Sequence, residues 1–133
     1  MRLFPPPRLA VACDTAAIVV FAVIGNLSHR GGVSVGGLAR DVLPILGCWL
    51  VAGALFGLYR RPTLGRLAAT WLVGVTAGVA IRAAVLQHTK AGKEAAFLAV
   101  ALTFTLLFAV AARLLAASTL QHAGPRTDRR ASP

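Results

Sequence analysis

The fold is decided by residues 95–117, which read AAFLAVALTFTLLFAVAARLLAA and carry one charged side chain, Arg113. A helix that crosses a bilayer needs roughly 20 mostly apolar residues, because at about 1.5 Å per residue this length covers a hydrocarbon core of ~30 Å. The stretch exceeds that length and lacks the polar–apolar alternation of a transmembrane β-strand. It therefore predicts a membrane-spanning helix.

Three more stretches meet the same criterion. They are residues 9–27, 42–59 and 67–86, separated by polar connections at 28–41, 60–66 and 87–94. We predict an all-α four-helix transmembrane bundle, a single integral membrane domain over residues 1–133. Residues 118–133 are polar and basic, and we expect a flexible tail there.

The composition agrees with a membrane protein. The chain has 133 residues, of which 57% are hydrophobic and 14% charged, and its mean hydropathy is +0.74. A soluble domain carries about a quarter charged residues, and one small core cannot hide this apolar excess. The net charge of +10 then favours contact with anionic lipid headgroups over nucleic acid, and we expect no nucleic-acid partner.

The distribution of basic residues predicts the orientation. With four spans, the N-terminus, the connection at 60–66 and the C-terminal tail share one side of the membrane. That side holds nine Lys and Arg residues and the other side holds five. Because the more basic side stays in the cytoplasm, we predict a multi-pass protein of the cell membrane with both termini cytoplasmic.

Charged residues inside the spans need a partner or a task. Asp14 and Arg113 both lie roughly 6–8 Å below the same surface, at about 1.5 Å per residue. They form a pair if the first and fourth helices are neighbours. Near the opposite surface, Asp41 is the expected counter-ion of Arg82.

Two interpretations of Asp14 stay open. In the first, Asp14 and Arg113 form a buried salt bridge that fixes helix packing. In the second, Asp14 binds a proton or a cation in an inward-facing cavity.

Glycine pairs predict where helices approach closely. Gly53 and Gly57 are four residues apart, as are Gly74 and Gly78. Small residues with this spacing let membrane helices pack backbone to backbone. We predict one seam between the second and third helices, with a homodimer contact as the alternative.

Catalytic and metal-binding patterns are absent from the sequence. It has no nucleophile elbow and no HExxH motif, and His29, Asp41, His88 and Glu94 lack the spacing of metal ligands. We predict no metal site, no cofactor and no enzymatic activity.

Several stretches together resemble an uncharacterised family of small four-helix membrane proteins, mainly actinobacterial, known as domain-of-unknown-function family 3054. The stretches are ACDTAAIVVFAVIGNLSHRGG, PILGCWLV, WLVGVTAGVAIRA and KEAAFLAVALTF, and the resemblance covers about residues 9–117. It implies the four-helix topology and a pattern of Asp14, Ser28, His29 and Arg82. The family has no assigned activity, so the resemblance implies no function.

The sequence therefore leaves two candidate functions open. The first is a non-enzymatic accessory or assembly protein of the membrane, working in a larger membrane complex. The second is a small proton-coupled transporter that acts as a homodimer through Asp14.

Overall fold

The computed structural model of the chain describes residues 3–30, 32–86 and 91–122. Within these ranges all regular structure is α-helical, which confirms the predicted fold class. Four helices follow one another, each long and apolar enough to cross a membrane: α1 Pro7–Arg30, α2 Val35–Leu55, α3 Leu64–Leu86 and α4 Ala91–His122.

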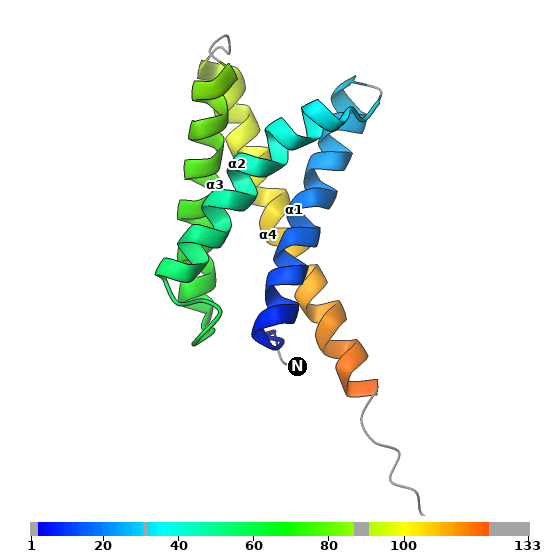
Figure 1. Cartoon of the computed structure of the whole chain (residues 1–133), viewed down its shortest axis with the longest axis vertical. Coiled ribbons are helices and arrows are strands. Elements are labelled where there is room, and N and C mark those ends of the chain that lie inside the picture. The colour runs from blue at the N-terminus through cyan, green and yellow to red at the C-terminus, as the bar shows by residue number, and fades with distance from the viewer. Residues whose placement is uncertain (1–2, 31, 87–90, 123–133) are drawn as a thin grey trace, which may run out of the picture.

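The helices form a closed ring of contacts. Among the described residues α1 packs on α2, α2 on α3, α3 on α4, and α4 returns to α1. The start of α1, the α2–α3 connection and the end of α4 lie at one end of the molecule (Figure 1). The α4 helix runs past the other three at that end.

The second helix is shifted along the chain from its predicted range of 42–59. It begins at Val35, where the Ser34 Oγ accepts the backbone N–H of Gly37 at 3.1 Å. This is an N-cap, which satisfies a backbone donor that the first helical turn leaves free. Residues 35–41 include two glycines, Arg40 and Asp41, so apolar length alone does not predict that they are helical.

The same helix ends at Leu55. Gly57 adopts a positive φ of 68°, and two backbone bonds close the end: Leu58 N–H donates to Gly53 O and Gly57 N–H to Ala54 O. This pattern is a Schellman motif, which favours glycine at the left-handed position. Gly57 therefore ends α2, and its predicted role in helix packing is wrong.

The other helices extend beyond their predicted spans of 9–27, 67–86 and 95–117. The α3 helix starts after Thr63, whose Oγ1 accepts the Arg66 N–H at 3.2 Å. The α4 helix continues to His122, so residues 118–122 are helical where a flexible tail was expected. Residues 123–133 lie outside the described part of the chain.

The α2–α3 contact is the most extensive in the bundle, and two glycines of α3 make it. A Cβ atom on Gly74 would lie 2.8 Å from the Cα of Trp49, and one on Gly78 would lie 2.6 Å from the Cα of Ile45. Neither distance leaves room for a methyl group, so α3 approaches the backbone of α2 directly.

Gly53 has another neighbour. A Cβ atom there would meet the ring of Tyr59 at 2.7 Å, so the space above Gly53 is filled by the α2–α3 connection. The predicted seam of four glycines is therefore correct for the α3 pair only.

Candidate functional site: two polar clusters

The first polar cluster joins α1 to α4. Asp14 and Arg113 are 0% and 1% exposed and form a two-pronged ion pair. Arg113 Nε donates to Asp14 Oδ1 at 2.9 Å, and Arg113 Nη2 donates to Oδ2 at 2.7 Å. Parallel charge-assisted bonds of this kind fix the geometry of both side chains.

Two aromatic donors complete this cluster. Trp49 Nε1 of α2 donates to Asp14 Oδ2 at 3.1 Å, and the Tyr59 hydroxyl donates to the same oxygen at 2.9 Å. We name Asp14, Trp49, Tyr59 and Arg113 the Asp14 cluster. The Asp14 carboxylate thus accepts four hydrogen bonds.

Tyr59 lies in the connection between α2 and α3, outside the spans. Burial raises the pKa of its hydroxyl above the ordinary value, and the negative charge of Asp14 raises this pKa further. The hydroxyl therefore stays protonated at neutral pH and remains a donor to the carboxylate.

Local backbone features put Tyr59 in place. Gly57 turns the chain back at the end of α2, and the missing side chain of Gly53 leaves room for the Tyr59 ring. Arg66 holds the turn from the other side, with Nη1 donating to Gly57 O at 3.2 Å and to Arg61 O at 3.0 Å. The glycines predicted to pack helices thus shape the Asp14 cluster.

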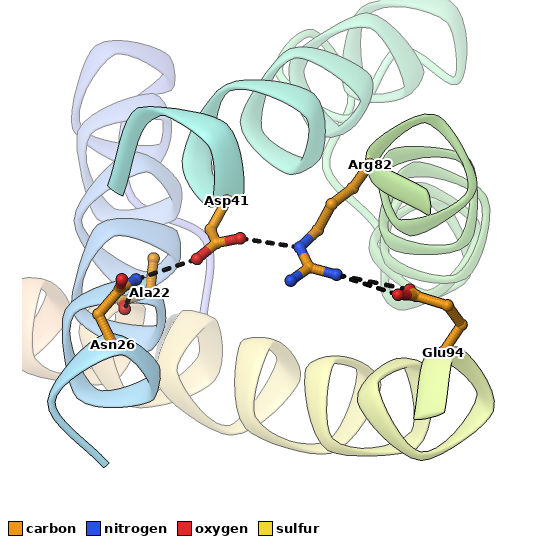
Figure 2. A network of polar contacts seen from close by, with 5 residues as sticks. All are labelled: Ala22, Asn26, Asp41, Arg82 and Glu94. Atoms are coloured by element: carbon orange, nitrogen blue, oxygen red, sulfur yellow. Dashed lines mark hydrogen bonds and ion pairs between the residues drawn. The ribbon is translucent and has the colours of Figure 1, made fainter. Parts of the chain in front are cut away.

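The second polar cluster lies at the opposite end of the bundle and draws one residue from each helix (Figure 2). Arg82 Nε of α3 donates to Asp41 Oδ1 of α2 at 2.8 Å. Asn26 Nδ2 of α1 donates to Asp41 Oδ2 at 3.0 Å and to Ala22 O at 2.9 Å. Glu94 of α4 accepts from Arg82 Nη1 at 3.4 Å through both oxygens.

We name Asn26, Asp41, Arg82 and Glu94 the Asp41 cluster. It differs from the Asp14 cluster in tightness, because the Arg82–Glu94 contact is long and the three ionisable side chains keep 12–16% of their surface exposed. The guanidinium of Arg82 also lies over the Phe97 ring, 4.1 Å from its centroid. Such a stack suits a cation that is partly removed from water.

A cavity of about 440 Å³ opens beside the Asp41 cluster. All four residues of the cluster line it, together with Lys93 and apolar side chains of α1 and α4. Its volume falls within the range of small-molecule sites. Asp14 is not among the residues that line it.

The structure brings together both of the charge pairs named from the sequence. It adds Trp49, Tyr59, Asn26 and Glu94, which helix positions alone did not assign to either pair. One signal was available for Trp49, since a buried indole N–H needs an acceptor. The depth of Trp49 along its span does not show that Asp14 is this acceptor.

The structure describes only part of the residue pattern that the family resemblance implies, namely Asp14, Ser28, His29 and Arg82. Asp14 and Arg82 belong to the two clusters, whereas Ser28 is exposed near the end of α1. The side chain of His29 and the whole of His88 lie outside the described part of the chain, as does any contact they make.

Comparison with known proteins gives one family. No curated protein and no solved structure matches the chain. Residues 11–116, which include all eight members of the two clusters, match the family described as "Protein of unknown function (DUF3054)". With four helices long and apolar enough to span a bilayer, this is a multi-pass membrane protein, and it belongs to the DUF3054 family.

Proposed function

We propose that the chain is a non-enzymatic accessory or assembly protein of the cell membrane. The supporting observation is the state of Asp14, whose two oxygens accept four hydrogen bonds at 0% exposure. A carboxylate that carries protons or attacks a substrate needs access to its partner, which a side chain at 0% exposure lacks. The bonds from Trp49 and Arg113 support a role for Asp14 in joining α1, α2 and α4 instead.

The surface of α4 supports the same proposal. This helix is the longest of the four, and most of its apolar span is left uncovered by the rest of the chain. Leu107 and Leu115 are among its exposed side chains. A membrane partner of an accessory protein has a long apolar surface available here, since helices in lipid associate through close packing.

Site-specific photo-crosslinking in the native membrane tests the proposal. A benzoylphenylalanine in place of Leu107 or Leu115 probes α4, and the same substitution at the exposed Leu72 of α3 is the matched control. We expect one second polypeptide of defined mass to be crosslinked from α4 and not from Leu72. Crosslinks to lipid alone, or only to a second copy of the chain, would contradict an accessory role.

A transporter is the second candidate, and the placement of the cavity favours it. The cavity lies at the Asp41 end, while Asp14 and Arg113 toward the opposite end are buried. A cavity at one end of a helix bundle is the arrangement expected of a carrier in one of its two states. Proton flux into proteoliposomes that carry the wild type or Asp14→Asn separates the candidates: the accessory role predicts no flux in either, and the transporter predicts a flux that Asp14→Asn abolishes.

A further inference from the structure

The cavity beside the Asp41 cluster has one apolar and one polar part. Phe21 and Phe97 face each other with their ring centroids 6.2 Å apart, and Val100 continues the apolar lining along α4. The polar part is formed by the Asp41 cluster and Lys93. A site with these two parts fits an amphiphile, a molecule with one apolar and one polar end.

The charges of the polar part are unevenly paired. Asp41 and Glu94 are two partly buried carboxylates that share the one guanidinium of Arg82. Lys93 also lines the cavity and is exposed. Within the partly buried cluster, the carboxylate that Arg82 holds less closely is therefore available to a cation.

Glu94 is the carboxylate that can still accept short hydrogen bonds. Asp41 uses both oxygens in bonds of 2.8 and 3.0 Å, whereas Glu94 has only the two 3.4 Å contacts to Arg82. Figure 2 shows Glu94 at the edge of the network, with Arg82 on one side. An arriving cation reaches Glu94 without displacing a short bond.

Asn26 supports a ligand that donates hydrogen bonds. Its amide nitrogen donates to Ala22 O and Asp41 Oδ2, which fixes the orientation of the amide. Its Oδ1 is buried and, within the part of the chain that the structure describes, has no hydrogen-bond partner. Like the carboxylates, this atom accepts and does not donate, so the free groups of the cluster favour a donor.

We propose that this cavity binds the ammonium end of an amphiphile, with Glu94 as the counter-ion and the apolar part of the ligand against Phe21, Phe97 and Val100. Two sources have this chemistry: a phospholipid with an amine headgroup and a free long-chain amine. The proposal is independent of the accessory role, because it concerns a site at the other end of the bundle from Asp14.

Binding of short-chain amphiphiles to the full chain in dodecyl maltoside tests the site. Decylammonium, decyl sulfate and decyl maltoside share one tail and differ in headgroup charge. We expect decylammonium alone to raise the melting temperature in a saturable way. Glu94→Gln should weaken its apparent Kd about tenfold, as expected for the loss of a partly buried counter-ion.

A second pair of variants keeps all charges in place. Val100→Trp fills the apolar part of the cavity and should abolish the saturable shift. Leu107→Trp, two turns further along α4 and outside the cavity lining, should bind decylammonium as the wild type does. An equal shift with decyl sulfate, or wild-type binding by both Glu94→Gln and Val100→Trp, would overturn the proposal.

Native mass spectrometry from nanodiscs distinguishes the two sources. Nanodiscs of phosphatidylethanolamine and of phosphatidylglycerol differ in whether the headgroup carries an amine. Retention of phosphatidylethanolamine by the wild type and not by Val100→Trp assigns the site to a lipid. Saturable decylammonium binding without retained phosphatidylethanolamine assigns it to a free amine.

Discussion

At the scale of single residues, Asp14 shows how a carboxylate is kept in an apolar bundle. Removing a charge from water is costly unless the charge is paired and hydrogen-bonded. Arg113 supplies the pairing, and Trp49 and Tyr59 supply neutral donors. Because an apolar pair of similar volume is often as stable as a buried ion pair, we expect the main contribution of the cluster to be the fixed position of α1 against α4.

Tyr59→Phe removes one donor to Asp14 and leaves the ring in place. We expect a loss of about 1.5–3 kcal/mol in the free energy of unfolding, the usual range for a hydrogen bond to a charged group. Unfolding of the purified protein in mixed detergent measures it. Thr103→Ala, which removes an exposed hydroxyl bonded within α4, is the control and should be nearly neutral. A neutral Tyr59→Phe would show that the bond contributes nothing.

The pH dependence at the alkaline end follows from the raised pKa of Tyr59. A group whose pKa is raised on folding contributes stability that is complete below its unfolded pKa, near 10, and is lost as the pH rises further. Stability should therefore fall above about pH 10, and less so in Tyr59→Phe. Tyr59 is the sole tyrosine, so absorbance near 295 nm follows its ionisation directly. Ionisation at pH 10 in the folded protein would contradict this prediction.

At the scale of helices, the α2–α3 contact depends on Gly74 and Gly78. Each lies against the backbone of α2, at Trp49 and Ile45, and backbone atoms cannot move aside as a flexible side chain does. The contact also places Trp49 where its indole reaches Asp14. Helix packing and the Asp14 cluster are therefore coupled through one residue.

Gly78→Ala should push α3 away from α2 and destabilise the protein by about 1–3 kcal/mol, the range for overpacking a close contact. Gly47→Ala is the matched control, because a Cβ at Gly47 of α2 meets no atom within 4 Å. The control should be neutral or stabilising by about 0.5–1 kcal/mol. Thermal unfolding of both variants measures the difference, and equal melting temperatures would contradict the close contact.

Helix number and approximate position could be predicted from the sequence, because apolar length decides which segments span a bilayer. Helix ends could not, since the Ser34 cap and the Gly57 turn lie in polar or mixed stretches. The matching depths of Asp14 and Arg113 along their spans predicted a pair on the condition that the first and fourth helices are neighbours, and depth does not give that condition. The roles of Trp49, Tyr59 and Glu94 depend on how the helices are rotated about their axes, which span length and depth do not give.

At the scale of the whole molecule, the two clusters lie at opposite ends and differ in kind. The Asp14 cluster joins α1 to α4 through a fully buried pair, and the Asp41 cluster joins all four helices through a partly exposed network beside a cavity. Asp14 and Arg113 are buried, whereas a cavity lies beside the Asp41 cluster. The bundle thus has a buried polar contact near one end and a partly exposed one near the other.

The predicted orientation is tested by cysteine labelling in cells. In a background with Cys13 and Cys48 replaced by serine, Val33→Cys lies in the α1–α2 connection and Arg61→Cys in the α2–α3 connection, both exposed. With both termini cytoplasmic, a membrane-impermeant maleimide should label Val33→Cys in intact cells and Arg61→Cys only after permeabilisation. The reverse pattern would place the termini outside.

The central claim is that Asp14 is held for packing, and a double-mutant cycle tests it most directly. We would measure the free energy of unfolding in nanodiscs for the wild type, Asp14→Ala, Arg113→Ala and the double variant. Each single change should cost about 3–5 kcal/mol, because it leaves a buried charge unpaired, and the double variant should recover much of that loss. A neutral or stabilising Asp14→Ala would contradict the claim and assign the carboxylate to ion binding.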